Sequence, residues 1–391
     1  MSSRSFLALL FFALLVAMLG FGIIIPLLPF LVEKFGGGGM SMGLLMAIFS
    51  VMQFAFSSFW GALSDRYGRK PILILGTAGN AITMFGFGFS ASLGWLYFFR
   101  ALGGLFSSAV TPVAMAFIAD STDDQARSSG MGLTGAAFGT GMVLGPGLGG
   151  MLGGYSLRAP FLLAGGLSLL SALLIALLLP ESLSPARRRP TPVRGPQFRE
   201  LFQALHSPIG FLLILAFLHN FALTNFEGIF AYYTAQRYHF SPQTVGIVTT
   251  TVGLSSAIVQ GILTGPFSRR WGDVKVVKAS LFASIFGFSL MLLARNLLEV
   301  ILTSNLFIFT NAMLRPGVAT LISRRAQQGQ GIAMGLNNAW MSLGRIVGPL
   351  WAGSMLELNL NYPFLSGALI MLIAFLAARK WLPEENQASN T

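Results

Sequence analysis

Residues 61–70 read GALSDRYGRK and lie between two long apolar stretches of the chain. Four of these ten residues, Asp65, Arg66, Arg69 and Lys70, are charged, although charged residues make up only 10% of the sequence. A short charged segment between two apolar stretches is typical of the turn between two membrane-spanning helices. The segment therefore predicts an integral membrane protein, and its density of charge indicates more than a simple connection.

The composition excludes several classes of protein. Of the 391 residues, 54% are hydrophobic, so lipid must be the solvent for much of the chain. There is no cysteine, which excludes disulfides and cysteine-ligated metals. The net charge of +12 would suit a nucleic-acid partner. The basic residues, however, fall in short loops between apolar segments, so no nucleic-acid partner is expected. His206 and His239 lie near opposite membrane surfaces, so the three histidines form no metal site.

Twelve apolar segments are long enough to cross a bilayer as helices, which takes about 20 residues. The first is too long for a signal peptide and is taken as a span. The predicted spans are 6–31, 41–63, 71–91, 94–118, 130–153, 159–180, 209–234, 243–266, 276–294, 297–321, 330–356 and 361–382.

The basic residues predict the orientation of these spans. With the N-terminus inside, 18 of the 25 Lys and Arg residues lie on the cytoplasmic side, counting those at the inner ends of spans, and three lie well inside spans. The outside holds four, Lys34, Arg158, Arg237 and Arg295. This asymmetry places both termini in the cytoplasm, and we expect a multi-pass protein of a bacterial inner membrane.

The chain is predicted to consist of two halves. Prolines and arginines alternate in residues 183–207, which predicts a solvated cytoplasmic linker between bundles formed by residues 1–182 and 208–391. The halves share an internal repeat: Gly145-Pro146 recurs as Gly348-Pro349, 203 residues later. The turn at 61–70 recurs in altered form at 265–273. Two similar halves imply alternating access to a central site by rocking of one half against the other.

These features resemble the major facilitator superfamily over essentially the whole chain. The 61–70 turn resembles its loop between spans two and three, residues 96–104 its arginine-bearing fourth-span motif, and residues 141–150 its fifth-span antiporter motif. The resemblance implies an all-α membrane protein with 12 transmembrane helices in two pseudo-symmetric six-helix bundles.

Within that superfamily the chain is similar to drug:proton antiporters of the NorA and Bmr type. Residues 22–29, 226–227, 313–316 and 335–338 carry this likeness. Those exporters have an aspartate in the tenth span three residues before the Arg-Pro pair, where this chain has Ala312. Coupling by a pair of acids is therefore not expected here.

The resemblance also assigns roles to two motifs. Asp65, with Arg66 and Arg69, would latch the halves together near residues 331–335; a solvated turn is the alternative. The predicted cytoplasmic gate is Gly61, Asp65, Arg66, Gly68, Arg69 and Lys70. The antiporter motif would form either a moving interface between the halves or a static, tightly packed one. Its residues are Gly141, Gly145, Pro146, Gly149 and Gly150.

Few charges lie inside the predicted spans. Glu227 is the only carboxylate well inside them, and Arg100, Arg315 and Arg345 are the only bases at such depth. A charge facing lipid costs at least a few kcal/mol, so each should face protein or a wet cavity. A carboxyl group removed from water can bind and release protons near neutral pH. Glu227 is therefore the predicted proton carrier, and a permanent ion pair with an arginine is the alternative.

Three basic residues accompany Glu227 in the predicted coupling site. Arg100 could neutralise Glu227, bind substrate anions, or bond to backbone carbonyls near the motif glycines. Arg345 has no assigned role beyond its charge, and His219 could relay protons or simply pack. The excess of bases over acids disfavours dicationic substrates and suits zwitterions or amphipathic anions.

The family likeness also indicates which side chains line the cavity. A phenylalanine-rich wall with few hydrogen-bonding groups predicts broad selectivity. The candidates are Gln53, Phe54, Phe138, Asn220, Phe230, Tyr233, Arg315, Asn337, Asn338 and Trp340.

The sequence thus predicts a proton-coupled exporter of amphipathic small molecules that works by alternating access. It needs no cofactor beyond the proton gradient, and a monomer suffices because the two halves complete one bundle. The alternatives are a lipid or lysolipid flippase and an uncoupled facilitator of the same fold. An enzyme or receptor is disfavoured, because no nucleophile–base pair, nucleotide-binding motif or large extramembrane domain is present.

Overall fold

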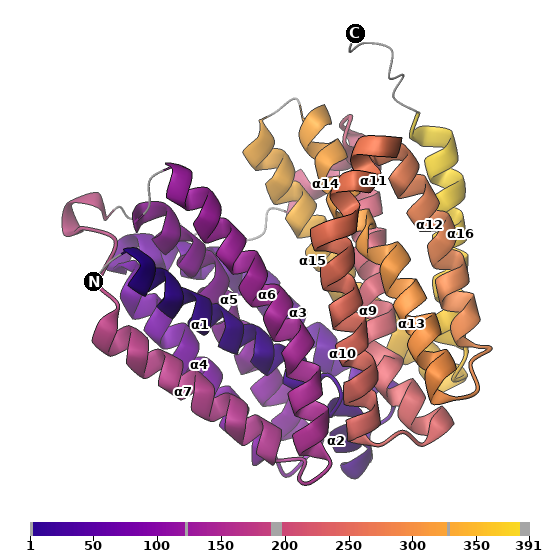
Figure 1. The fold of residues 1–391 in the computed structure, drawn as a ribbon, viewed down its shortest axis with the longest axis horizontal. Coiled ribbons are helices and arrows are strands. Elements are labelled where there is room, and N and C mark those ends of the chain that lie inside the picture. Colours follow the sequence, from indigo (N-terminus) through magenta and orange to yellow (C-terminus); the bar gives the residue numbers. More distant parts are fainter. Residues whose placement is uncertain (1–2, 122–123, 189–197, 327–328, 384–391) are drawn as a thin grey trace. The chain divides into compact units, whose positions relative to one another are not determined.

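The computed structural model describes residues 3–121, 124–188, 198–326 and 329–383, and these ranges contain helices and no β-strand (Figure 1). Ten helical segments are long and apolar enough to cross a membrane, and α6 and α15 bring the long segments to twelve. α6 and α15 have the length but are rich in glycine. The prediction of an all-helical membrane fold is confirmed.

The helices have the following bounds. In the first half they are α1 (Ser3–Ile24), α2 (Leu28–Lys34), α3 (Gly39–Tyr67), α4 (Arg69–Gly88), α5 (Leu93–Ser121), α6 (Asp124–Gly153) and α7 (Ala159–Leu178). In the second half they are α9 (Gly210–Tyr238), α10 (Pro242–Ile258), α11 (Thr264–Trp271), α12 (Asp273–Met291), α13 (Leu297–Ala312), α14 (Leu314–Arg325), α15 (Gln330–Leu358) and α16 (Tyr362–Trp381). A π-helical turn joins α10 to α11, and α13 continues into α14 with a break at Met313.

The predicted first span and the predicted linker differ from the structure. The predicted first span, 6–31, is broken, because α1 ends at Ile24 and α2 begins at Leu28. Pro26 lies at this break, and proline removes a backbone donor and clashes with the preceding helical turn. Pro29 is the second residue of α2, a position that tolerates proline. The predicted linker, 183–207, contains the short helix α8 (Phe198–Gln203); residues 189–197 lie outside the described part of the chain.

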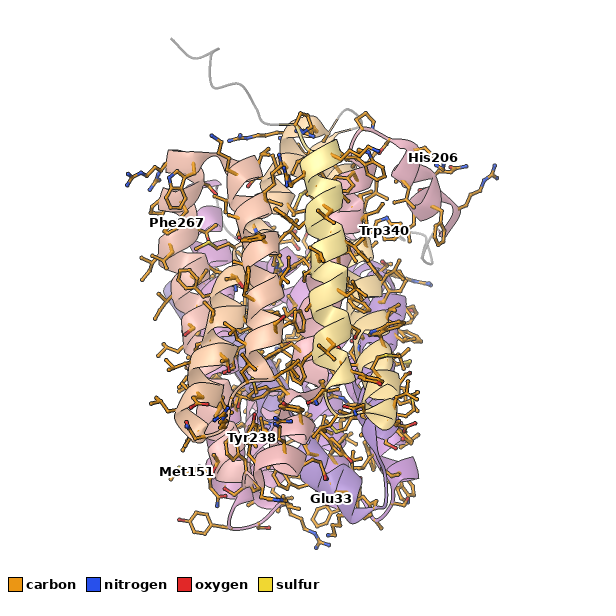
Figure 2. The ribbon with its side chains drawn as sticks, turned by 90° about the vertical axis from the view of Figure 1, so that its right-hand side faces the viewer. Glu33, Met151, His206, Tyr238, Phe267 and Trp340 are labelled. Carbon is orange, nitrogen blue, oxygen red and sulfur yellow. The ribbon has the colours of Figure 1, made fainter. Side chains whose placement is uncertain are left out.

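The structure groups the chain into two compact units. Unit 1 comprises residues 1–37, 44–196 and 239–250, and unit 2 comprises residues 38–43, 197–238 and 251–391. Segment 38–43 thus belongs to unit 2 and segment 239–250 to unit 1. The predicted bundles, 1–182 and 208–391, stay a prediction. Figure 2 shows His206, Phe267 and Trp340 toward one end of unit 2 and Tyr238 toward the opposite end.

The same helix pairs form in both units. In unit 1, α1 packs on α6, and α4 packs on α5 and α7; in unit 2, α9 packs on α15, and α12 packs on α13 and α16. The helix Leu93–Ser121 corresponds to Leu297–Arg325, 204 residues later at both ends. Glycines with positive φ end the preceding turn in each unit, Gly68 at +108° and Gly272 at +79°, and they too are 204 residues apart. These correspondences support the repeat that the sequence indicates.

Candidate functional site

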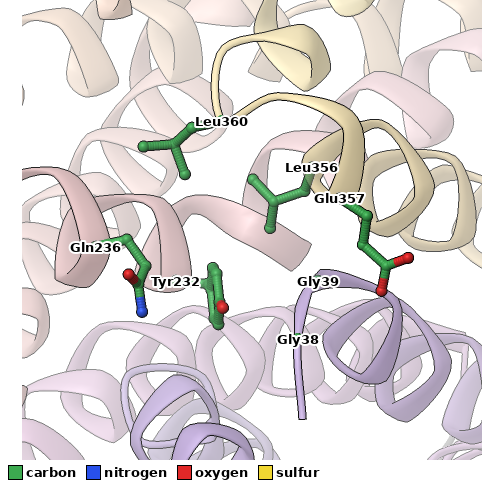
Figure 3. A pocket seen from close by; sticks show the side chains of 7 residues that line it. All are labelled: Gly38, Gly39, Tyr232, Gln236, Leu356, Glu357 and Leu360. Atoms are coloured by element: carbon green, nitrogen blue, oxygen red, sulfur yellow. The ribbon is translucent and has the colours of Figure 1, made fainter.

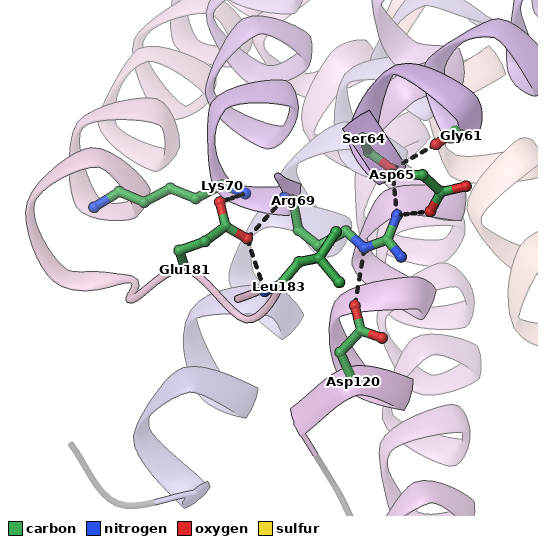
Figure 4. Close-up of polar contacts among 8 residues, drawn as sticks. All are labelled: Gly61, Ser64, Asp65, Arg69, Lys70, Asp120, Glu181 and Leu183. Atoms are coloured by element: carbon green, nitrogen blue, oxygen red, sulfur yellow. Dashed lines mark hydrogen bonds and ion pairs between the residues drawn. The ribbon is translucent and has the colours of Figure 1, made fainter. Parts of the chain in front are cut away.

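The charged turn at 61–70 forms an ion-pair network inside unit 1 (Figure 4). Arg69, the first residue of α4, is buried, and its Nε donates to Asp120 Oδ2 of α5 at 2.9 Å. Its Nη1 donates to the Ser64 hydroxyl at 2.6 Å and to the Asp65 carboxylate. Arg69 therefore ties the end of α3 to the start of α4 and the end of α5.

A carboxylate from beyond α7 completes this network. Glu181 accepts the backbone N–H of Arg69 at 2.8 Å and that of Lys70 at 3.2 Å, so it caps the N-terminus of α4. Gly68 leaves the room for this cap, because a Cβ there would collide with the Glu181 carboxylate. Its positive φ gives a second reason for glycine at this turn.

The remaining residues of the predicted gate are more open. Apart from its chain neighbours and its own helix backbone, no described residue has an atom within 4 Å of the position a Cβ on Gly61 would take. Arg66 is exposed, with its guanidinium 5.2 Å from the ring centre of Tyr67. The predicted latch between Asp65 and residues 331–335 stays a prediction, since the two segments belong to different units.

Unit 2 carries the corresponding ion pair with its charges exchanged. Asp273, the first residue of α12, is buried and pairs with Arg324 near the end of α14 at 3.4 Å. Both members lie 204 residues after Arg69 and Asp120, so cation and anion have changed places between the repeats. In each unit an ion pair therefore joins the start of one helix to the end of the following long helical segment. The cation lies at the start of α4 in unit 1 and near the end of α14 in unit 2.

The glycines of the predicted antiporter motif pack in two directions. A Cβ at Gly145 would lie 2.8 Å from both Gly22 Cα and Leu19 O of α1, and Gly141 and Gly149 also face α1 closely. A Cβ at Gly150 would instead lie 2.6 Å from Gly246 Cα of α10, within unit 1. Pro146 lies inside α6 between these contacts. Three of the glycines thus serve close packing within the first bundle, and Gly150 contacts a helix from the second half of the sequence.

We expect Gly145→Ala to lower the free energy of unfolding by about 1–3 kcal/mol, because the new methyl group meets backbone atoms that cannot turn away. Gly139→Ala, on the same helix, is the matched control, since no atom of another described helix lies within 4 Å of its Cβ position. It should leave stability unchanged or raise it by about 0.5–1 kcal/mol. Thermal unfolding of the purified variants in detergent measures both effects, and equal midpoints would contradict the close packing of α6 on α1.

Arg100 is held inside unit 1 by backbone and aromatic groups. Its side chain is 1% exposed, its Nε donates to Leu45 O of α3 at 3.0 Å, and its Nη2 lies 3.2 Å from Met46 Sδ. The guanidinium also lies 4.5 Å from the ring centre of Phe49. Of the three roles considered for Arg100, the bond to a backbone carbonyl is the one this geometry shows.

Glu227 lies on α9 between buried aromatic neighbours. Phe226 and Phe230 are buried and stack with ring centres 5.1 Å apart, whereas the Glu227 side chain is half-buried. Among the described residues of unit 2, none forms a hydrogen bond or ion pair with its carboxylate. The alternative of a permanent structural ion pair therefore finds no partner within this unit.

The other predicted coupling residues lie on neighbouring helices of unit 2. His219 is buried on α9, and its Nδ1 has no hydrogen-bond partner among the described residues. Arg315 is the second residue of α14, and Arg345 lies in the middle of α15. Arg345 is exposed, and its Nη2 donates to the Ser342 hydroxyl at 3.0 Å.

The predicted cavity residues divide by exposure. Phe138, Arg315 and Asn338 are exposed, and Gln53 and Phe54 are half-buried, with Gln53 donating to the Ser107 hydroxyl at 3.3 Å. The other five pack inside unit 2: Asn220, Phe230, Tyr233, Asn337 and Trp340.

Unit 2 also contains a pocket of about 430 Å³ at the C-terminal end of α15 (Figure 3). Glu357 lies at its edge and accepts the N–H of Met40 at 3.1 Å, so it caps the start of α3. The lining residues are Gly38, Gly39, Tyr232, Gln236, Leu356, Glu357 and Leu360.

Sequence reasoning missed three carboxylates, Asp120, Glu181 and Glu357, that bind backbone or guanidinium groups of distant helices. Each is an acid at the end of an apolar segment, in a chain with only 13 acidic residues. Because acids are so few, their positions at the ends of helices could have indicated a structural role. The partners, however, lie 51 to 317 residues away in the sequence.

The twelve long helices, their repeated pairing and the few charges inside them define a membrane transporter. Residues 10–226 and 212–391 match the family model for the Major Facilitator Superfamily, and the chain belongs to this family. The predicted family, fold and non-enzymatic transport role are confirmed.

Two groups of curated proteins are similar over nearly the whole chain. Multidrug resistance protein 1 of Bacillus subtilis (strain 168) is 30% identical over 382 residues, 96% of each chain. Multidrug resistance protein 2 of the same strain is 29% identical over 377 residues, 96% of this chain and 94% of the relative. Quinolone resistance protein NorA of Staphylococcus aureus (strain COL) is 29% identical over 376 residues, 93% of this chain and 95% of the relative.

Solved structures agree on the fold. The human organic anion transporter MFSD10 (TETRAN) is 27% identical, with a TM-score of 0.69 over 97% of this chain and 100% of that one. The nucleoside transporter NupG gives a TM-score of 0.79 at 15% identity, over 97% of this chain and 99% of that one, and shows the fold alone.

Proposed function

We propose that this transporter is a proton-coupled exporter, an antiporter of protons and amphipathic small molecules that works by alternating access. The observation that carries the proposal is Glu227, a half-buried carboxylate in a membrane-spanning helix with no bonded partner among the described residues of its unit. A carboxyl group in such surroundings can change its protonation state when its hydration changes. The similarity to proteins named for multidrug and quinolone resistance supports amphipathic drugs as the substrate class.

The location and assembly are part of the same proposal. We place the chain in the bacterial inner membrane with both termini in the cytoplasm, because 18 of its 25 basic residues lie in the predicted inner loops. It would function as a monomer in the lipid bilayer, with the proton gradient as its only energy source.

A second candidate, an uncoupled facilitator, is favoured by one observation. The tenth span carries Ala312 where similar exporters have an acid. Glu227 would therefore be the only carboxylate available to couple proton movement to substrate transport. A lipid or lysolipid flippase of the same fold would differ from both in moving lipids across the bilayer.

Transport by the purified protein in liposomes separates these functions. We expect a cationic amphipathic dye to accumulate when a pH gradient is imposed and to leak out when a protonophore collapses it. One pH unit supplies about 1.4 kcal/mol per proton, enough for about tenfold accumulation of a substrate exchanged electroneutrally for one proton. Equilibration without accumulation would indicate a facilitator, and movement of fluorescent lipid analogues without dye transport would indicate a flippase.

A further inference from the structure

One exposed face of unit 2 is formed by the helices α12 and α16, which pack side by side (Figure 1). The ring centres of Phe282 on α12 and Phe375 on α16 lie 5.1 Å apart, and that of Phe286, one turn along α12, lies 5.1 Å from Phe282. Phe282 and Phe286 are 47% and 49% exposed. The large exposed side chains of α16 up to this level are also apolar: Leu365, Leu369, Leu372, Ile373 and Leu376. An exposed apolar surface on membrane-spanning helices suits acyl chains and not water.

The register of the two helices brings a lysine and an arginine together above these rings. Phe288 of α12 packs on Gly367 of α16, and Phe282 packs on Phe375, so the helices are antiparallel. Toward the start of α12 and the end of α16, the next residues on the same faces are Lys278 and Arg379, each four positions from its ring. Four residues are about one helical turn, or about 6 Å along the axis. Both basic side chains therefore lie one turn beyond the aromatic pair, next to each other at the end of the two helices.

Neither basic side chain has an acidic partner in the described part of the chain. Arg379 is exposed and Lys278 half-buried, and no described residue forms a hydrogen bond or ion pair with either. Asp273, at the start of α12, is buried and pairs with Arg324 of α14, about 140° around the helix from Lys278. The helix dipole favours a cation in the last turn of α16 but gives no such support near the start of α12. The packing of the protein therefore does not account for Lys278.

The corresponding helix pair of unit 1 lacks this arrangement. α4 packs on α7 as α12 packs on α16, but α7 has no basic residue in its last turn, whereas α16 has Arg379 and Lys380. Ile74 of α4 takes the position 204 residues before Lys278. The guanidinium at the start of α4, that of Arg69, is bonded to carboxylates of unit 1. The basic residues beside the rings are thus a property of unit 2 and not of the repeated fold.

We propose that this face binds one anionic phospholipid, with the phosphate at Lys278 and Arg379 and the acyl chains along the three rings. A guanidinium can give a phosphate two parallel N–H bonds, and an ammonium adds a further charged donor. Long basic side chains can extend to the head-group level while their stems stay on apolar surface.

The dimensions of the face suit a lipid. Phe286 lies eight residues from Lys278, about 12 Å along α12, which is less than half of the hydrocarbon thickness of about 30 Å. The rings therefore lie at the depth of the upper acyl chains when the phosphate is at the lysine. A soluble anion would leave them without a partner. This inference needs only that α12 and α16 cross a membrane, so it is independent of proton coupling.

Lipid binding to the full-length protein in uncharged detergent tests the proposal. Native mass spectrometry separates the protein with no lipid from the protein with one lipid bound. Titration with phosphatidylglycerol and with phosphatidylcholine of the same acyl chains gives the preference for the anionic head group. We expect Lys278→Gln and Arg379→Gln each to lower this preference about fivefold, which is the typical contribution of one basic residue near an anionic lipid surface. The double variant should retain little preference.

Two comparisons make the outcome decisive. Arg295→Gln removes an exposed arginine beyond the opposite end of α12, and it should leave the preference for phosphatidylglycerol unchanged. Inorganic phosphate in large excess should not displace the lipid, because it lacks the acyl chains. The proposal is overturned by an unchanged preference in the double variant, by an equal loss in Arg295→Gln, or by displacement with inorganic phosphate, which would indicate a site for small anions. No transport is measured, so none of these results bears on the proposed export function.

Discussion

Glu227→Gln is expected to abolish gradient-driven accumulation of substrate while leaving substrate binding intact. The amide has nearly the same shape as the carboxyl group but cannot take up or release a proton. The accumulation ratio of a dye should therefore fall from about tenfold per pH unit to about one, which is simple equilibration. Transport in proteoliposomes with and without a pH gradient measures the ratio, and dye binding in detergent verifies that the variant is folded.

A matched control tests whether the loss of accumulation is specific to Glu227 or follows from removing any carboxylate of a membrane helix. Glu357→Gln changes an acid on α15 of the same unit, and its amide oxygen can still accept the N–H of Met40. This variant should accumulate dye as the wild type does. Full pH-dependent accumulation by Glu227→Gln would show that another group carries the proton, and equal losses in both variants would point to a structural effect.

Arg69→Ala is expected to lower the free energy of unfolding by about 2 kcal/mol. The substitution removes the guanidinium that Asp65, Asp120 and Ser64 share, so two carboxylates and a buried hydroxyl each lose a hydrogen bond. The loss is smaller than for a fully buried pair, because the Asp120 and Asp65 side chains are 26% and 35% exposed and water can replace part of the interaction. Thermal and denaturant unfolding in detergent measures the change.

Two comparisons show whether the network itself is responsible. Arg66→Ala removes the neighbouring exposed arginine and should shift stability by no more than about 0.5 kcal/mol. The double variant Arg69→Ala/Asp120→Ala should be less destabilised than the sum of its single variants, because each single change already removes their shared bond. Strict additivity would mean that Arg69 and Asp120 do not interact in the folded protein.

Patterns along the chain were sufficient for the fold class and for most helices. Runs of about 20 apolar residues have only one regular structure available in lipid, because each backbone group must be bonded within its own helix. The error at 6–31 arose because hydropathy outweighed Pro26, whose backbone restrictions end α1 at Ile24. The low density of charge also singled out Glu227 and the three arginines of the spans before any packing was known.

The sequence by itself thus determined a helical membrane bundle, its repeat, and the short set of charges that must avoid lipid. The tertiary structure alone decided which groups meet: Arg69 with Asp120 and Glu181, Arg100 with the Leu45 carbonyl, and Arg324 with Asp273. Helical periodicity indicates which side of a helix is apolar, but not which distant helix that side contacts. A charge inside a span is costly wherever it lies, and only the packing of remote segments determines whether a carboxylate, a carbonyl or an open cavity receives it.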